Sequence, residues 1–282
     1  MKPFAGVLMG LISLVSVHDV RAQDGVAAFR WQKDQVFRYK VDHKTVAKDT
    51  RGQVENEVQT QINLIREWKV LEVDAKGRAK IQLKLLALKS ATKRPDGEVL
   101  QFDSEKPDDA TPQLRDQLAR FIGEPVAFLE VDSLGKVERV IENRFGSSSR
   151  FETDPPFGVV LPGTAIKNGD SWVRTVHFTP VGSNLPVPGG GNLEARVKTT
   201  CAAATASSLT LRTAAQIGKQ PEGIPERISL LQYFPDTEVV LDAPGVPPKL
   251  IVSKIDRSLK YGEKEESLYR LVSEYRETRI DE

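Results

Sequence analysis

The stretch that decides the fold is EVQTQINLIREWKVLEVDAKGRAKIQLKLLALKSA, residues 57–91. Apolar side chains alternate with polar ones on both sides of its centre, Asp74-Ala75-Lys76-Gly77. Strict alternation is typical of a strand that buries one of its faces. An Asp-x-x-Gly sequence is typical of a tight turn, because glycine readily takes the positive φ that such turns require. The sequence therefore predicts a long antiparallel hairpin with its turn at 74–77.

The same alternation recurs along most of the chain, and helical periodicity is rare. About twelve strands are predicted, and an open sheet of that size tends to curl. We therefore expect a mainly β (α+β) protein with strongly curved antiparallel sheets, in a half-barrel or barrel-like shape. Besides the hairpin, the predicted strands lie at residues 37–43, 99–102, 126–131, 137–141, 172–176, 193–203, 208–217, 227–234, 237–241, 250–259 and 267–279.

One helix is predicted at residues 111–122. Thr111 suits the N-cap and Pro112 suits the first helical position. Gly123 is placed to end the helix with a positive φ. An apolar stripe at helical spacing predicts one buried face, formed by Leu114, Leu118, Phe121 and Ile122.

A Pro- and Gly-rich stretch at 146–170 divides the predicted strands into two units, 23–145 and 171–282. Asp34–Arg38 (DQVFR) resembles Asp170–Arg174 (DSWVR), which suggests an internal duplication. The alternative is that any two antiparallel meanders look alike at this level. The sequence leaves open whether the two units share a single core.

Residues 1–22 have the features of a secretory signal peptide. Lys2 gives a positive start, residues 4–17 carry no charge, and Val20-Arg21-Ala22 is a small-residue cleavage pattern. The uncharged run is short for a bilayer of about 30 Å, although retention as an anchor is the alternative. We expect export to the periplasm or the exterior after cleavage near Ala22, with no membrane-spanning segment in the mature chain.

Charge and cysteine content exclude several classes of protein. The chain has 40 Lys and Arg against 39 Asp and Glu, and removal of residues 1–22 leaves it formally neutral. A nucleic-acid binder needs a basic surplus, so this class is not expected. Cys201 is the single cysteine, which excludes an intramolecular disulfide and a four-thiolate zinc site. We interpret Cys201 as a small buried residue of a strand.

Motifs that carry known chemistry are missing from the sequence. It contains no G-x-S-x-G, H-E-x-x-H, P-loop or G-x-G-x-x-G motif. His43 and His177 are the only histidines after residue 22, and we interpret both as ordinary strand residues. No catalytic, cofactor-binding or metal-ligating residue is assigned, and no cofactor is expected.

The segment Pro162–Trp172 (PGTAIKNGDSW) resembles the strand start of an uncharacterised domain family of secreted bacterial proteins. Trp68-x-Val70-x-x-Val73-Asp74-x-x-Gly77-x-Ala79 and Asp132-x-x-Gly135-Lys136-Val137 fit the same pattern. The resemblance covers roughly residues 29–280. It implies a fold of turns and strand starts, and no activity that can be transferred.

Three functions remain open from the sequence. The first is a non-enzymatic binding or carrier module of the cell envelope, with an apolar small molecule, a lipid or an envelope protein as its partner. This hypothesis expects a concave apolar pocket under residues 111–122. The second is a structural or interaction protein that uses an exposed strand edge such as residues 265–279. The third is a hydrolase without a recognisable motif, which requires a cleft with two carboxylates of shifted pKa.

Overall fold

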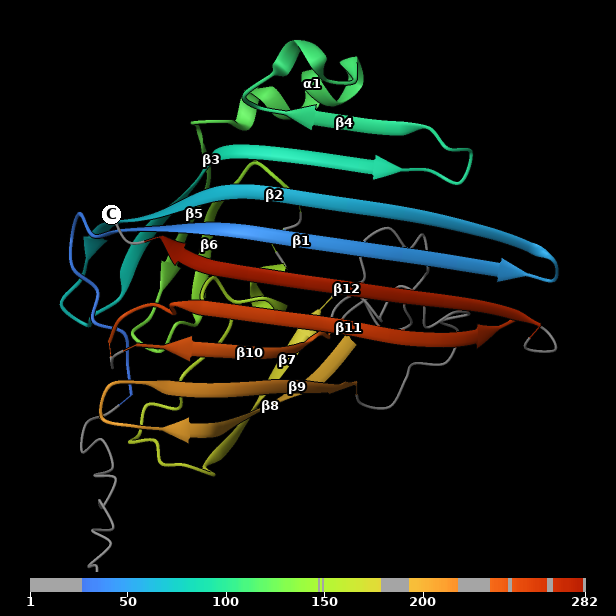
Figure 1. Cartoon of the computed structure of the whole chain (residues 1–282). Coiled ribbons are helices and arrows are strands. Elements are labelled where there is room, and N and C mark those ends of the chain that lie inside the picture. Colours follow the sequence, from blue (N-terminus) through green and yellow to red (C-terminus); the bar gives the residue numbers. More distant parts are fainter. Residues whose placement is uncertain are drawn as a thin grey trace, which may run out of the picture.

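The mainly β fold is confirmed by a computed structural model, in which all strands form one antiparallel sheet that does not close into a barrel (Figure 1). The structure describes residues 27–146, 148, 150–178, 193–217, 234–242, 245–262 and 266–280. The strand order is β6-β5-β3-β2-β1-β12-β11-β10-β9-β8-β7, and β4 pairs with β3. The strands are β1 (Val36–Arg51), β2 (Val54–Val73), β3 (Ala79–Lys93), β4 (Val99–Asp103), β5 (Pro125–Val131), β6 (Val137–Asn143), β7 (Ser171–Phe178), β8 (Leu193–Ala204), β9 (Leu209–Ile217), β10 (Asp236–Leu241), β11 (Leu250–Tyr261) and β12 (Ser267–Ile280).

The hairpin predicted at 57–91 is formed by β2 and β3. Its turn uses Gly77 at a φ of 76°, as the sequence indicates. The Asp74 carboxylate accepts hydrogen bonds from the backbone N–H groups of Lys76 and Arg78, which fixes the turn from within. Trp68 and Val70 of β2 are buried, so the alternation identified the face that packs into the core.

The centre of the sheet is formed by β1 and β12, which pair along almost their whole length, from Arg38 opposite Ile280 to Arg51 opposite Ser267 (Figure 1). On its other side, β12 pairs with β11 from Tyr261 to Leu250. The expectation that residues 265–279 offer an exposed strand edge is therefore wrong. The alternation of apolar and polar residues predicted this strand, but it could not show that a neighbouring strand pairs with each of its two edges.

The helix predicted at 111–122 consists of α1 (Pro112–Leu118) followed by a 3-10 turn, η2 (Ala119–Phe121). Pro112 occupies the start of the helix, and Gly123 follows it at a φ of 78°. Thr111 does not cap the helix with its side chain. Its hydroxyl instead accepts a hydrogen bond from the Gln101 N–H, which ties α1 to β4.

The helix covers a small apolar cluster that is separate from the large core. Leu88, Phe102 and Ala110 are buried at the centre of this cluster. The partly buried side chains that pack against them are Ile62, Leu64, Leu114, Leu118 and Ile122. The stripe predicted on the helix is therefore used for packing against β2, β3 and β4.

A separate, larger core lies inside the curl of the sheet. Buried residues of β1, β2, β3 and β5 form one cluster with buried residues of β8, β9, β10 and β11. Strands this far apart in the sheet order meet at one core only if the sheet bends strongly round it. Phe157 lies within this core, with its ring centroid 5.7, 5.3 and 5.8 Å from those of Phe29, Trp31 and Trp68.

The stretch predicted as a connection, 146–170, contains the short helix α2 (Arg150–Thr153) and much of this core. Its buried members are Phe151, Phe157, Val159, Leu161 and Ile166. Gly158 has a φ of 69°, and a Cβ at this position would lie 3.1–3.3 Å from side-chain atoms of Ile251 and Val239. The segment is therefore fitted closely against the inner face of the sheet.

The two similar segments at 34–38 and 170–174 lie in different places in the sheet. The first leads into β1 at the centre, whereas the second leads into β7, which pairs only with β8 among the described strands. The division into units 23–145 and 171–282 and the duplication both stay predictions.

The signal peptide at 1–22 and most of the strand predicted at 227–234 lie outside the described residues. Within the described ranges, no helix has the length and apolar character needed to cross a membrane.

Cys201 is buried, as predicted, with 1% of its surface exposed. Burial, together with the nearby charge of Asp170, raises the pKa of its thiol, so little thiolate is present at neutral pH. We expect a thiol reagent at pH 8 to label native Cys201 at least ~100-fold more slowly than the urea-unfolded chain, because labelling requires opening of the core. Ellman absorbance followed over time measures this. Equally fast labelling of the folded protein would contradict the burial.

Candidate functional site

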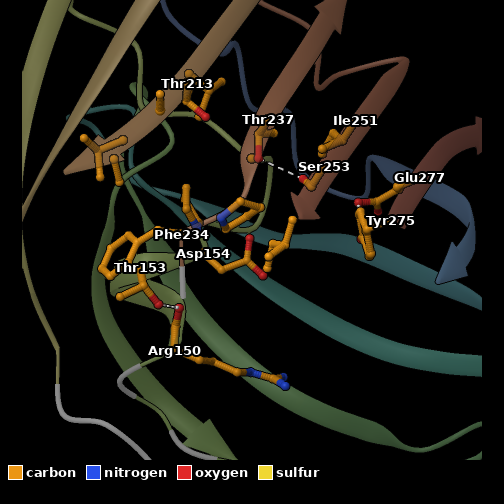
Figure 2. Close-up of a pocket in the computed structure, with 18 of the residues that line it drawn as sticks. Arg150, Thr153, Asp154, Thr213, Phe234, Thr237, Ile251, Ser253, Tyr275 and Glu277 are labelled. Carbon is orange, nitrogen blue, oxygen red and sulfur yellow. Dashed lines mark hydrogen bonds between the residues drawn. The ribbon is translucent and has the colours of Figure 1, made fainter. Parts of the chain in front are cut away.

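The candidate site is a cavity of about 610 Å³ on the inner face of the sheet, beneath the segment 153–160 (Figure 2). Its walls come from β1, β2 and β7 to β12. This volume is within the usual range for a small-molecule site, about 300–1,000 Å³. This cavity is not the one considered from the sequence, under residues 111–122, where α1 packs on the small apolar cluster described above.

A row of polar side chains crosses the floor of this cavity. Each member lies directly opposite the next on the neighbouring strand, so the row follows six adjacent strands. Strands are about 4.8 Å apart, which gives a row roughly 24 Å long. Its members, from β8 to β12 and then β1, are Thr199, Thr213, Thr237, Ser253, Tyr275 and His43. Figure 2 shows Thr237 and Ser253 joined by a hydrogen bond, with their hydroxyl oxygens 2.8 Å apart.

An apolar row lies beside the polar one on β8 to β11, two residues along each strand. Val197 of β8 faces Ala215 of β9, and Ile255 continues the row on β11, next to Ser273 on β12. Phe234 and Pro235, just before β10, also line the cavity. The cavity floor is therefore amphipathic, with hydroxyl groups along one band and hydrocarbon along the next.

His43 closes the polar row on β1. Its Nε2 lies 2.8 Å from the Ser273 hydroxyl and 3.1 Å from the Thr45 hydroxyl, and its ring packs edge-on against Tyr275. Burial lowers the pKa of His43, which favours the neutral imidazole at physiological pH. His177 is exposed on β7 and is not among the residues that line this cavity. The two histidines are not brought together.

A buried ion pair stands at one end of the cavity. The Arg66 Nε and Nη2 donate to the two carboxylate oxygens of Glu277 at 2.6 and 2.5 Å, and the Tyr275 hydroxyl donates to Glu277 at 2.8 Å (Figure 2 shows the last pair). Glu277 is 1% exposed. Burial alone would lower the pKa of Arg66, but the charge of Glu277 outweighs this effect and raises it. The pKa of Tyr275 is also raised, chiefly by burial. The Arg66 guanidinium is thus charged at any ordinary pH.

Three further charged groups line the same end: Arg150 and Asp154 around α2, and Arg174 on β7. Asp154 faces the open space of the cavity, so water reaches it, yet protein surrounds the carboxyl group on its other sides. Burial raises the pKa of Asp154, and the positive charge of Arg66 opposes this rise only in part. Burial lowers the pKa of Arg150. Among the described residues, neither the Asp154 carboxyl nor the Arg150 guanidinium has an ion pair or a hydrogen-bonding partner.

No site residue was predicted from the sequence, although Arg66 could have been recognised as one. Arg66 interrupts an apolar alternation formed by Ile62, Leu64, Trp68 and Val70, so its charged side chain lies on the face of the strand that is expected to be buried. Such a charge needs a partner in the folded protein. Asp154 carried no comparable signal, because it lies within the Pro-rich stretch.

The Gly169-Asp170-Ser171-Trp172 segment has the structural role expected for it. The Asp170 carboxylate accepts a hydrogen bond from the Lys167 N–H at 2.7 Å, and the Trp172 indole donates to the Val160 carbonyl at 2.9 Å. The first bond shapes the turn, and the second attaches β7 to the segment above the cavity. Within the described residues, no group of three or more His, Cys, Asp or Glu side chains is arranged to hold a metal ion.

Comparison with known proteins gives weak similarities only. No protein-family model and no curated protein matches the chain. A structure entitled lipid–protein interactions in lipovitellin is 12% identical with a TM-score of 0.35, and the match covers 89% of this chain and 25% of that one. DynF from the dynemicin biosynthesis pathway of Micromonospora chersina is 6% identical with a TM-score of 0.21, and the match covers 96% and 92%. MucB in complex with MucA(peri) is 7% identical with a TM-score of 0.14, and the match covers 85% and 89%. The chain therefore spans a quarter of the lipovitellin chain's length, and none of these similarities supports a functional argument.

Proposed function

We propose that this protein is an exported, non-enzymatic binding or carrier module of the cell envelope, which holds an amphipathic small molecule or lipid on the inner face of its sheet. One observation carries the proposal: a polar row and an apolar row run side by side along the floor of a single cavity of about 610 Å³. N-terminal sequencing of protein from the envelope fraction tests the cleavage expected near Ala22.

Among the described residues, one hydrogen bond joins members of the polar row, between Thr237 and Ser253. A sheet face that only builds a core is normally apolar, because a buried hydroxyl without a partner destabilises the fold by about 1–3 kcal/mol. Thr199 is 2% exposed, and Thr213 and Ser253 are half-buried on the same floor. The Thr213 and Ser253 hydroxyl groups can therefore contact the oxygen or nitrogen atoms of a bound molecule, while the Val197–Ile255 band offers contact to its hydrocarbon part.

The geometry favours binding over hydrolysis. A hydrolase of the kind considered from the sequence needs two carboxylates that exchange protons with the substrate. Both oxygens of Glu277 are engaged by Arg66, and one also accepts from Tyr275. This leaves Asp154 as the single unengaged carboxyl among the described residues that line the cavity.

Filling the cavity is expected to abolish binding. Ser253 lies in the middle of the polar row, so the indole of Ser253→Trp occupies the centre of the floor. We expect native mass spectrometry of the gently purified wild-type protein to show a co-purifying small molecule, and the Ser253→Trp protein to lack it. With N-phenyl-1-naphthylamine as a fluorescent probe, the variant should bind at least ~10-fold more weakly.

Ser258→Trp is the matched control, because Ser258 lies on the same strand but is exposed and does not line the cavity. It should retain the co-purified molecule and the affinity for the probe. Two outcomes would refute the proposal: a wild-type protein that is free of small molecules and does not bind the probe, or equal binding by Ser253→Trp and wild type.

A further inference from the structure

The charges at the α2 end of the cavity do not balance. Three guanidinium groups, from Arg66, Arg150 and Arg174, meet two carboxylates, from Asp154 and Glu277. They come from four separate parts of the chain: β2, α2 with the residue that follows it, β7 and β12. Among the described residues this is one positive charge more than negative, and the Arg150 guanidinium is half-buried, where a charge without a partner is disfavoured.

Arg66 and Glu277 neutralise each other through their bidentate pair, so neither is available to a ligand. The Arg174 guanidinium donates a hydrogen bond, at 3.3 Å, to the Thr153 backbone carbonyl, which links β7 to α2 at this end of the cavity.

Among the described residues, the Arg150 guanidinium makes no ion pair and no hydrogen bond. Its guanidinium stacks on the Phe151 ring, with 4.8 Å between the guanidinium carbon and the ring centroid, and no ion pair within the described residues includes it. Asp154 lies four residues along the chain, yet no ion pair joins the two side chains. A half-buried arginine that faces a cavity and remains unpaired is typical of a site for a ligand anion.

We infer that the molecule held in the cavity carries an anionic head group, a carboxylate or a phosphate, which Arg150 binds with Arg174 beside it while the hydrocarbon tail lies along the Val197–Ile255 band. This inference rests on the proposed function and specifies its ligand class. It has a direct consequence for Asp154, which lies beside the head group and would repel it when ionised. Because the pKa of Asp154 is raised by burial, protonation removes this repulsion and supplies a hydrogen-bond donor.

A series of ligands with the same ten-carbon chain tests the head group: decanoate, decyl phosphate, decane-1-sulfonate, decanol and decyltrimethylammonium. Each is titrated below its critical micelle concentration, with displacement of N-phenyl-1-naphthylamine as the readout. At least one of the anions should bind at least ~10-fold more tightly than decanol, and the cation should bind most weakly. The ratio of decanoate to decyl phosphate affinity distinguishes a fatty-acid-like ligand from a phosphate-bearing one.

Arg150→Gln should weaken binding of the anions ~10-fold or more and leave decanol binding unchanged. Arg212→Gln is the control: Arg212 is 69% exposed on β9, next to Thr213 in sequence, and does not line the cavity. Thermal melting of both variants confirms that they fold. If Arg150→Gln fails to fold, the same ligand series is measured with Arg174→Gln, which should likewise weaken binding of the anions and not of decanol.

The effect of pH is measured with decane-1-sulfonate, whose charge does not change between pH 5 and 8. Its affinity should rise as the pH falls through the raised pKa of Asp154, and Asp154→Asn should bind tightly at every pH in this range. His43 also titrates at the cavity, so the profile is repeated in His43→Gln. The other groups that face this end are Arg66, Arg150, Arg174 and Tyr275, which keep their charge states in this range, and Glu277, which is held by Arg66.

The results separate this inference from the proposed function. Equal affinity for decanol and all three anions, or a loss of decanol binding in Arg150→Gln that matches the loss of anion binding, would overturn the anionic head group and leave the carrier function standing. No binding of any member of the series, together with no effect of Ser253→Trp on the probe, would overturn both.

Discussion

Glu277→Gln is expected to lower the free energy of unfolding by about 3 kcal/mol, the lower end of the range for breaking a buried ion pair. The substitution keeps the shape of the side chain but leaves the Arg66 guanidinium without a counter-charge. Arg66 is 21% exposed on the side of the cavity, so water compensates part of the loss, which places the effect at the lower end. Urea unfolding followed by Trp fluorescence measures it as a lower midpoint at an unchanged m-value.

Two controls show whether the missing partner is the cause. The double variant Arg66→Met/Glu277→Leu removes both charges and should recover most of the lost stability, since apolar replacement of a buried pair is often neutral. Glu238→Gln breaks an exposed pair with Arg212 and should lower the stability by less than ~1 kcal/mol. A loss in Glu277→Gln no larger than in Glu238→Gln would show that the pair contributes little to the fold.

Phe157→Ala is expected to lower the free energy of unfolding by about 3–5 kcal/mol. The side chain is 1% exposed and lies among the rings of Phe29, Trp31 and Trp68, where its loss leaves a cavity that the bent sheet cannot easily close. Pro155, Pro156 and the backbone up to Val160 line the ligand cavity on either side of Phe157. The same variant should therefore weaken probe binding as well as stability.

Phe145→Ala is the matched control, because Phe145 is 39% exposed and lies outside the large core. It should lower stability by less than about 1 kcal/mol and leave probe binding unchanged. If Phe157→Ala has the melting temperature of the wild-type protein, the prediction is contradicted, and the Phe157 side chain does not hold the segment 150–166 against the sheet.

The strands and the helix could be predicted because they depend on local rules. Alternation at 57–91 and the Asp74–Gly77 turn specify a hairpin without reference to any other part of the chain. Pro112 and Gly123 specify the ends of a short helical segment in the same way. The position of each strand in the sheet is not local information, which is why the edge expected at 265–279 was assigned to a central strand.

The candidate site could not be predicted because its residues come together only when the strands pair in the correct register. Thr199, Thr213, Thr237 and Ser253 are separated by 14, 24 and 16 residues, and no periodicity links them. Three antiparallel pairings place them in one row, and a shift of one residue in any pairing would turn a member to the opposite face. Arg66 and Glu277 likewise meet across β1 from opposite ends of the sequence.

The pairing of β1 with β12 sets the order in which the protein can fold. The partners are 216 to 242 residues apart in the sequence, so this ladder closes a long loop and is slow to form. Until residues 267–280 are available, β1 presents an unpaired edge, and the β1–β6 and β7–β11 groups have no strand between them. The inner face acquires its curvature only when this last strand is inserted, because β12 supplies the floor between Ser253 and His43. The cavity floor of a growing or truncated chain is therefore complete only after β12 has been added.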